Sequence, residues 1–407
     1  MHAWPAPDLP RLPGRGPRLK LYDTASGTVR RTRQDQVARM YVCGVTPYDS
    51  THLGHAATYL TFDLIARVLQ DGGREVDYVQ NVTDVDDPLL ERAAATNEDW
   101  RALADREIER FRTDMTWLRA IPPRRFVGAV EAIAEIAAVV EKLRDDGCVY
   151  ELGDDLYYSV DADPEFGRIS GYDEETMLAC ARERGGDPDR QGKRNPLDPL
   201  LWRAERPGEP AWASRVGRGR PGWHIECTTI ALNSLGPDFD IQGGGKDLVF
   251  PHHECSASHA RRVSGLTRFA EHYVHPGSIG LEGVKMSKSL GNLVFVHRLR
   301  TEGADGAAIR VALFAHHYRA DRDWRHDSLD QAQATVTRWR QALGLRAGPP
   351  AAPLLAEVRD RLSDDLDTPA VLRAVNRWTD EALDEGGEDR DAPHLVRKTL
   401  DALLGLA

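Results

Sequence analysis

The order of predicted elements in residues 1–82 constrains the fold more than any other feature of the sequence. Residues 38–46 form a mostly apolar stretch that predicts a buried strand, and residues 54–70 place apolar side chains at helical spacing before paired glycines. A second predicted strand follows at 75–82. Elements in this order form a parallel unit, in which ligands bind at the carboxyl ends of the strands and at helix N-termini. We therefore expect an α/β protein with its functional site at that edge.

The pattern changes along the chain and predicts four segments. They are an α/β part with an N-terminal extension, an α+β insert rich in charged helix and Pro/Gly loops, a second α/β part and a helical C-terminal domain, at 1–121, 122–221, 222–304 and 305–407. The second α/β part carries an expected helix at 252–263 and an expected strand at 273–279. The simplest interpretation is one sheet that is interrupted by the insert and then completed.

Composition and charge limit the class of protein. Apolar residues make up 41% and charged residues 29% of the 407-residue chain, as in soluble globular enzymes. The net charge of −11 gives no sign of nucleic-acid or membrane binding, although an acidic protein can still bind nucleic acid through a local basic patch. The five cysteines are widely spaced and odd in number, which argues against a disulfide framework. No stretch approaches the ~18 apolar residues of a membrane span, so we expect a cytoplasmic protein.

The tetrapeptide His52-Leu53-Gly54-His55 lies between the first expected strand and the first expected helix. A glycine between two imidazoles lets a nucleotide phosphate approach the backbone N–H groups at the start of a helix. Taken alone, the tetrapeptide is equally consistent with two ordinary loop histidines. It becomes informative only together with a second motif.

That second motif is Lys285-Met286-Ser287-Lys288-Ser289, followed by Leu-Gly-Asn. Its lysines and serines can supply charge and hydrogen-bond donors to a polyphosphate, whereas a solvated basic loop is the simpler alternative. In this order, and at corresponding edges of two half-sheets, the two motifs resemble the paired signatures of class I aminoacyl-tRNA synthetases. The resemblance implies a class I synthetase-like Rossmann catalytic domain that binds ATP, with 1–121 and 222–304 as its two halves.

A narrower resemblance, from about residue 20 to about residue 370, is to the cysteinyl branch of that family. It is carried by five stretches, which are Tyr41-Val42-Cys43-Gly44, Asn81-Val82-Thr83-Asp84-Val85-Asp86-Asp87, Gly222-Trp223-His224-Ile225-Glu226-Cys227, Gly243-Gly244-Gly245-Lys246-Asp247 and Phe250-Pro251-His252-His253-Glu254. The resemblance implies a zinc ion that binds the substrate thiolate, with Cys43, Cys227 and His252 as its protein ligands. Two thiols and an imidazole suit zinc, and three protein ligands leave one position open for a substrate sulfur.

The fourth zinc position is where the sequence departs from the cysteinyl synthetases. Their His-His-Glu-Asn-Glu stretch carries a fourth ligand at its second Glu, and the matching residue here is Ser256, which follows Cys255. Serine is a poor zinc ligand. Cys255 lies three residues after His252 on the same expected helix face and could substitute, but we favour three protein ligands plus substrate or water.

Two further departures point to a different acceptor. We expect no anticodon-gripping domain, because the sequence stops at Ala407 soon after the resemblance ends. Residues 183–188, Glu-Arg-Gly-Gly-Asp-Pro, resemble a signature of the mycothiol-pathway cysteine ligases, which join cysteine to glucosaminyl-inositol, although a polar turn is the alternative interpretation. The implied reaction activates L-cysteine with ATP as cysteinyl-adenylate, releases pyrophosphate, and transfers cysteine to the sugar amine with no tRNA partner.

Two alternatives remain at this point. A compact cysteinyl-tRNA synthetase is the main one, and it would need a basic surface for tRNA that the charge balance does not show. A catalytically silent paralogue that acts as a regulatory subunit is the other. The intact histidine and lysine motifs argue against it, because a chain without catalysis has no physical need for both.

The resemblance also implies roles for individual residues. Charge on the triphosphate is expected to be stabilised by His52, His55, Lys285 and Lys288. Thr46 and Thr83 are expected to hold the amino and carboxyl groups of cysteine, with Trp223 as a wall of the pocket. The other residues expected to contact the substrates or the adenylate are Cys43, Gly44, Val45, Thr58, Asn81, Val82, Gly245, Lys246, Asp247 and Ile279. Magnesium is expected with ATP because it neutralises phosphate oxygens, and the enzyme is expected to be a monomer.

Overall fold

A parallel sheet of five strands forms the centre of the protein, whose computed structural model describes residues 1–286 and 290–406. In chain order the strands are β3 (Val37–Val42), β4 (Glu75–Val82), β5 (Arg125–Gly128), β10 (Phe239–Gly243) and β11 (Ala270–Val274). Their spatial order is β11-β10-β3-β4-β5, so the chain builds outward from β3 on one side and then returns to its other side. Ligands of open α/β sheets bind at the carboxyl ends of the strands beside such a reversal, here between β3 and β10.

Both faces of the central sheet are covered. Met40 and Val42 of β3 pack in one hydrophobic core with α1 (Leu53–Asp71), while Tyr41 packs in a second core with α6 (Trp223–Leu235). Successive side chains of a strand point to opposite faces, so a mostly apolar strand needs a layer on each side. The helix expected at 54–70 is α1, and the strand expected at 75–82 is β4.

The second α/β part differs from expectation in one strand. The expected helix at 252–263 is α7 (Glu254–Ser264), which follows two short turns, η3 (Lys246–Leu248) and η4 (Val249–His253). The prediction of one strand at 273–279 was wrong, because β11 ends at Val274 and a separate strand, β12 (Ile279–Leu281), begins at Ile279. Pro276 has no N–H for a ladder, and a Cβ on Gly277 would lie 2.5 Å from the carbonyl oxygen of Ala320. The chain therefore turns between two short strands.

A second sheet lies in the segment expected as an insert. It is antiparallel in the order β6-β7-β8-β9. The elements of this segment are η1 (Val130–Ala132), α4 (Ile133–Asp145), β6 (Val149–Leu152), β7 (Asp155–Tyr158), η2 (Val160–Ala162), α5 (Glu174–Glu183), β8 (Leu200–Ala204) and β9 (Gly219–Pro221). Because β5 pairs with β4, the chain leaves the central sheet after residue 128, inside the range 122–221. The division into four domains stays a prediction.

The remaining elements lie at the N-terminus, beside α1 and in the C-terminal region. They are β1 (Lys20–Asp23), β2 (Thr28–Arg31), α2 (Asp87–Thr96), α3 (Trp100–Trp117), β13 (Val284–Lys285), α8 (Val296–Thr301), α9 (Gly306–Phe314), β14 (Arg322–Trp324), α10 (Ser328–Leu343), α11 (Ala351–Ser363), α12 (Thr368–Asp384) and α13 (Ala392–Leu404). The short strand β14 pairs with β12 and is the exception to an otherwise helical C-terminal region.

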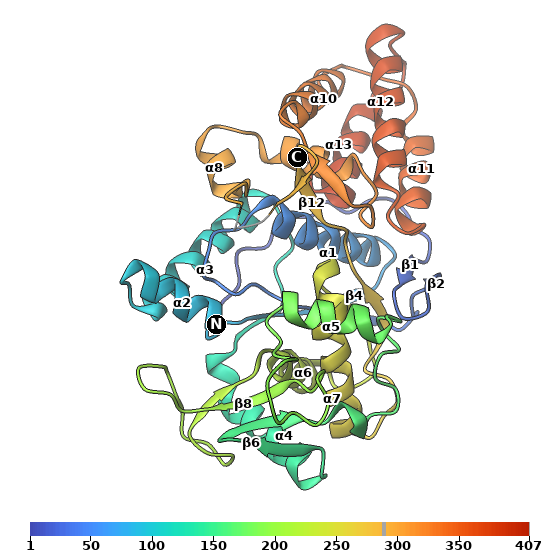
Figure 1. Ribbon diagram of the computed structural model, residues 1–407. Helices are drawn as coiled ribbons and strands as arrows, with labels where there is room; N and C mark the ends of the chain where they lie inside the picture. Colours follow the sequence, from blue (N-terminus) through green and yellow to red (C-terminus); the bar gives the residue numbers. More distant parts are fainter. Residues whose placement is uncertain (287–289, 407) are drawn as a thin grey trace.

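Figure 1 shows how these parts are arranged. The helices α10, α11 and α12 lie at one end of the molecule, α4, β6 and β8 lie at the other, and α1 and β4 lie between them. Among the helices that the structure describes, none is long and apolar enough to cross a bilayer.

Candidate active site

The three expected metal ligands come together at the strand reversal. The Sγ atoms of Cys43 and Cys227 and a ring nitrogen of His252 lie within 4.8 Å of one another, and all three side chains are buried. They come from the end of β3, from α6 and from η4. Within the described part of the chain the Nε2 atom of His252 is buried without a hydrogen-bond partner. A buried imidazole nitrogen left unpaired beside two thiols fits a metal ligand, because burial of an unpaired polar atom is otherwise costly.

The two cysteines of this cluster differ in their electrostatics. Burial raises the pKa of the Cys43 thiol well above its ordinary value, and the neighbouring Cys227 adds to the shift. Burial also acts to raise the pKa of Cys227, but a hydrogen bond from Cys43 and the charge of His252 outweigh it and lower that pKa well below its ordinary value. The cluster therefore favours one thiolate, which is the form of cysteine that binds a metal ion.

Neither candidate for a fourth ligand is presented to this cluster. Among the described residues the Sγ atom of Cys255 is not part of the group, and burial raises the pKa of its thiol well above the ordinary value. The hydroxyl of Ser256 donates a hydrogen bond to the carbonyl oxygen of His224, over 3.2 Å.

A chain of hydrogen bonds connects the Cys43 loop to α6. The backbone N–H of Gly44 donates to Oδ1 of Asn81 over 2.8 Å, and Nδ2 of Asn81 donates to Oγ1 of Thr83 over 3.2 Å. The Thr83 hydroxyl in turn donates to Oε2 of Glu226 over 3.1 Å. Only glycine fits at position 44, because a Cβ there would lie 1.7 Å from the carbonyl oxygen of Asn81. These hydrogen bonds hold Thr83, the residue expected to bind the carboxyl group of cysteine, against α6, which carries Cys227.

The ring of Trp223 lies against the metal cluster. Its centroid is 4.3 Å from the centroid of the His252 ring, with 34° between the planes. Trp223 is the first residue of α6 and is only partly buried, so part of its surface remains accessible. This geometry suits the expected role as a pocket wall.

The two histidines of the first motif form a pair at the start of α1. Their rings stack with centroids 3.8 Å apart, and Nδ1 of His52 accepts a hydrogen bond from the backbone N–H of Gly54 over 3.1 Å. Burial lowers the pKa of His52, and burial together with His52 lowers that of His55 well below its ordinary value. A neutral His52 that accepts at Nδ1 carries its proton on Nε2. The pair therefore offers a ring N–H donor beside a helix N-terminus, where anions bind.

The glycine turn after β10 lies beside the same helix start. A Cβ on Gly245 would lie 2.5 Å from Oδ1 of Asp247 and 3.8 Å from the hydroxyl of Thr58, so these three residues are neighbours. Lys246, in contrast, directs its ammonium group to the carboxylate of Asp321, 2.6 Å away. The turn brings an exposed carboxylate to the edge at which nucleotides bind in α/β sheets.

Several expected contact residues have side chains elsewhere. Val45, Val82 and Ile279 belong to the hydrophobic core on the α1 side, so only their backbone groups can face a ligand. Thr46 is partly buried, and its carbonyl oxygen accepts a hydrogen bond from the backbone N–H of Tyr48.

The second motif begins at β13, which pairs with β12. Lys288 and the side chain of Lys285 lie outside the described residues. The segment after the motif is hydrogen-bonded to the first motif, since the N–H of Leu53 donates to the carbonyl of Val294 and the N–H of Val296 donates to that of Thr51, both over 2.9 Å. The structure thus joins the segment that follows the second motif to the first motif.

Sequence reasoning missed several buried groups around the cluster. Nε2 of His253 lies 3.3 Å from Sγ of Cys43, and its Nδ1 lies 2.7 Å from Nε2 of His275. His224 contacts His252, with 2.9 Å between their Nδ1 atoms. His224, His253 and Glu226 belong to the stretches that carry the resemblance, so a signal for them existed. His275 had none, because only the pairing of β10 with β11 brings it close.

Comparisons with known proteins show the family of this chain. Residues 28–334 match the family model described as tRNA synthetases class I (C) catalytic domain. A protein of Thermomonospora curvata is 60% identical over 413 residues, and one of Nocardia farcinica is 58% identical over 410 residues, with 100% of this chain and of each relative covered. Both are named L-cysteine:1D-myo-inositol 2-amino-2-deoxy-alpha-D-glucopyranoside ligase. This chain belongs to their family. The resemblances drawn from the sequence are confirmed.

A solved structure supports the fold. Mycobacterium tuberculosis methionyl-tRNA synthetase in complex with methionyl-adenylate matches with a TM-score of 0.63 and 17% identity, over 90% of this chain and 92% of that one. The class I synthetase-like α/β fold expected from the two motifs is therefore confirmed.

Proposed function

We propose that the protein is an ATP-dependent ligase that joins L-cysteine to the amine of glucosaminyl-inositol (1D-myo-inositol 2-amino-2-deoxy-alpha-D-glucopyranoside) in mycothiol biosynthesis. The observation that carries this proposal is the buried group of Cys43, Cys227 and His252 at the strand reversal, in a chain 58% to 60% identical over its whole length to ligases of that name. The products are an amide, AMP and pyrophosphate.

The first step forms cysteinyl-adenylate. A carboxylate oxygen of cysteine attacks the α-phosphorus of ATP, and pyrophosphate leaves as its bond to that phosphorus breaks. The Nε2–H of His52 is proposed to donate to a phosphate oxygen, and the stacked ring of His55 is proposed to support it; the hydrogen bond from Gly54 to Nδ1 of His52 supports this role. Lys285 and Lys288 are proposed to neutralise the triphosphate, together with magnesium bound to ATP. Asp247 and the glycine turn are proposed to contact the adenosine.

Selection of cysteine is proposed to use zinc held by Cys43, Cys227 and His252. The chemistry that zinc supplies when bound is coordination of the substrate thiolate, which separates cysteine from serine far better than packing does. Thr83 is held by Asn81 and Glu226 and is proposed to bind the carboxyl end of cysteine, with Thr46 at the amino end.

The second step transfers cysteine to the sugar. The amine nitrogen of the acceptor forms a bond to the cysteinyl carbonyl carbon, the bond from that carbon to the phosphate oxygen breaks, and AMP leaves with the electron pair. The amine must be unprotonated to attack and loses a proton to solvent or a nearby base. The rate of transfer should therefore rise with pH until that amine has titrated.

One acceptor comparison tests the proposal. Enzyme, ATP and cysteine are given either glucosaminyl-inositol or tRNA, and the amide and cysteinyl-tRNA are measured. We expect amide formation with the sugar amine and no charging of tRNA. Cysteine-dependent exchange of pyrophosphate into ATP should occur without any acceptor, because activation precedes transfer. Efficient cysteinyl-tRNA formation, or an inert sugar amine, would favour the synthetase alternative.

A further inference from the structure

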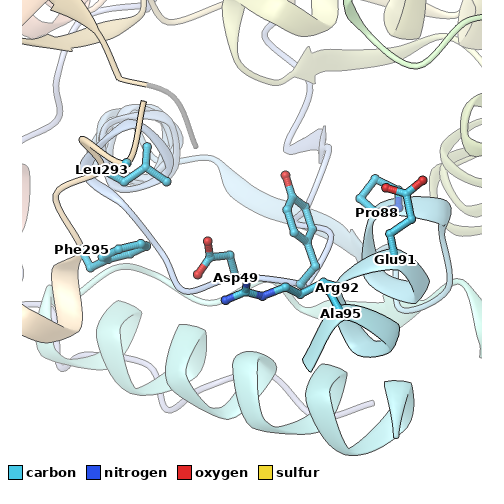
Figure 2. Close-up of a pocket in the computed structure, with 9 residues that line it drawn as sticks. Asp49, Pro88, Glu91, Arg92, Ala95, Leu293 and Phe295 are labelled. Atoms are coloured by element: carbon cyan, nitrogen blue, oxygen red, sulfur yellow. The ribbon is translucent and has the colours of Figure 1, made fainter. Parts of the chain in front are cut away.

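A cleft of 430 Å³ opens beside the histidine motif. Side chains that line it include Tyr48, Asp49, Glu91, Arg92, Leu293 and Phe295. Figure 2 shows Leu293 and Phe295 on one side of the cleft and Pro88 and Glu91 on the other, with Asp49 and Arg92 between them. None of the residues expected to bind the metal, cysteine or the adenosine lines this cleft, so its occupant is unassigned.

Two walls of the cleft are nevertheless joined through the backbone to the catalytic edge. Phe295 forms a backbone bridge with His52, and the Tyr48 N–H donates a hydrogen bond to the carbonyl oxygen of Thr46 over 2.9 Å. One wall therefore begins at the proposed phosphate-binding histidine, and another begins two residues from the threonine proposed to hold cysteine. A molecule in the cleft would therefore lie beside the segments that carry His52 and Thr46.

The third wall is the helix α2. It follows directly from the loop after β4, and its N-cap residue Asp86 accepts a hydrogen bond from the N–H of Asp87 over 2.8 Å. Glu91 and Arg92 project from this helix and are exposed. In the described residues neither side chain forms an ion pair. Their charged groups are thus available to a ligand.

We infer that this cleft binds the amino-sugar acceptor, an inference that rests on the proposed function. Two carboxylates, Asp49 and Glu91, and one guanidinium, Arg92, give the cleft a negative formal charge. A nucleic-acid end carries phosphates and needs a basic surface. A phosphate-free polyol instead needs both hydrogen-bond donors and hydrogen-bond acceptors. The aromatic rings of Tyr48 and Phe295 suit the C–H faces of sugar rings. A cavity of this size is in the range of small-molecule sites.

The direction of the acceptor follows from the position of Asp49. Its Oδ1 accepts the N–H of Ser50 over 2.9 Å, and it lies on the loop that leads to the histidine motif. The acceptor amine is assigned to the Asp49 end, where its N–H can donate to the carboxylate and the chain leads to Thr46 on one side and to the histidine motif on the other. The inositol hydroxyls then lie against Glu91 and Arg92 on α2.

The test compares E91Q and R92Q with wild type and with R144Q. Arg144 is also an exposed arginine of a helix, α4, far along the chain from the cleft, so R144Q matches the loss of positive charge in R92Q. Two quantities are measured, the KM for glucosaminyl-inositol in amide formation and the rate of cysteine-dependent pyrophosphate exchange without acceptor. We expect each cleft variant to have about a tenfold higher KM for glucosaminyl-inositol, the effect of one lost charge-assisted hydrogen bond. The rate of pyrophosphate exchange without acceptor should stay at the wild-type value.

Calorimetric titration of glucosaminyl-inositol into the enzyme separates this inference from the proposed function. Weakened binding to E91Q and R92Q, but not to R144Q, supports the cleft. An unchanged acceptor KM and unchanged binding in both cleft variants would overturn it, as would a loss that falls mainly on pyrophosphate exchange. If wild type binds the sugar in this cleft but forms no amide, the proposed function fails and the binding site stands.

Discussion

At the scale of single residues, the thiol of Cys227 is one of the two sulfur groups on which metal binding depends. Burial acts to raise the pKa of the Cys227 thiol, but Cys43 and His252 outweigh it and lower that pKa. The pKa of the Cys43 thiol is raised by burial. Removal of Cys227 therefore leaves a buried neutral thiol and an imidazole. Two such groups hold zinc weakly, because zinc ligands must be deprotonated.

We predict that Cys227→Ser loses its zinc and at least about 100-fold in cysteine-dependent pyrophosphate exchange, at the upper end of what disturbed metal sites lose. Elemental analysis of the purified protein gives the zinc content. Cys148→Ser is the matched control, because Cys148 is also a buried free cysteine but directly precedes β6 and donates its thiol hydrogen to the carbonyl oxygen of Asp146. Stoichiometric zinc in Cys227→Ser, or wild-type protein that holds none, would contradict the prediction.

The sequence predicted these ligands only through resemblance. Cys43, Cys227 and His252 have no compact spacing, and their proximity depends on the pairing of β3 with β10 and on the packing of α6 against the sheet. Residues that act through contacts, such as Glu226 on Thr83, were quoted within motifs but had no assigned role until the hydrogen bond was seen.

At the scale of elements, a buried ion network joins three helices. Asp63 of α1 pairs with Arg67 over 2.8 Å and with Arg310 of α9, and Nε of Arg310 donates to the carbonyl of Leu404, the last residue of α13, over 2.6 Å. Burial disfavours the Asp63 carboxylate, but the charges of Arg310 and Arg67 outweigh it and lower its pKa. These residues therefore hold the C-terminal helices against the catalytic sheet.

We predict that Arg310→Met lowers the free energy of unfolding by about 3–5 kcal/mol, because one partner of a buried charge is removed. Arg377→Met is the control, since its ion pair joins an exposed arginine of α12 to the partly exposed Glu357 of α11 and is expected to contribute less than about 1 kcal/mol. Urea unfolding of the three proteins measures both values. Equal losses in the two variants would show that the network does not stabilise the junction.

Asp84, after β4, gives a prediction about pH. Burial raises its pKa to about 6, and its Oδ1 accepts the N–H of Val130 over 2.8 Å. The folded state then binds this proton more tightly than the unfolded chain, so the contribution of Asp84 to stability falls as pH rises from about 4 to about 6 and stays lost above. Asp84→Asn keeps the acceptor oxygen without the titration.

The stability of Asp84→Asn relative to wild type should therefore increase between pH 4 and pH 6 and remain constant to pH 8. Urea unfolding at several pH values measures this difference. A difference that does not change with pH would show that Asp84 is not buried as a protonated acid in the folded protein.

Element prediction succeeded where one side-chain period extended over a whole segment, as in α1 and β4. It failed at 273–279, because the interruption at Pro276 and Gly277 depends on the approach of the backbone at Ala320. The strand β14 was missed for a related reason. Its three residues pair only with β12, and a contact between distant segments leaves no local pattern.

At the scale of the whole molecule, the charge of −11 and the mixed charges of the cleft bear on the acceptor. A polyanionic acceptor would bind through several phosphate contacts, and its affinity would fall about 10³- to 10⁵-fold between 50 and 200 mM salt. A phosphate-free amino-sugar with at most one charge makes no such contacts, and a buried or partly buried hydrogen bond is screened little by salt.

We therefore predict that the KM for glucosaminyl-inositol changes by less than about threefold between 50 and 200 mM salt, and that added tRNA does not compete with it. Steady-state amide formation at several salt concentrations, with and without tRNA, measures both effects. Because ATP is itself highly charged, pyrophosphate exchange without acceptor is recorded in the same buffers, and only the change beyond that seen in exchange is attributed to the acceptor. The prediction fails if the acceptor KM rises steeply with salt and the rise remains after the salt effect on pyrophosphate exchange is subtracted. That result would mean that the acceptor site recognises phosphate and that a nucleic-acid end fits it better than an amino-sugar.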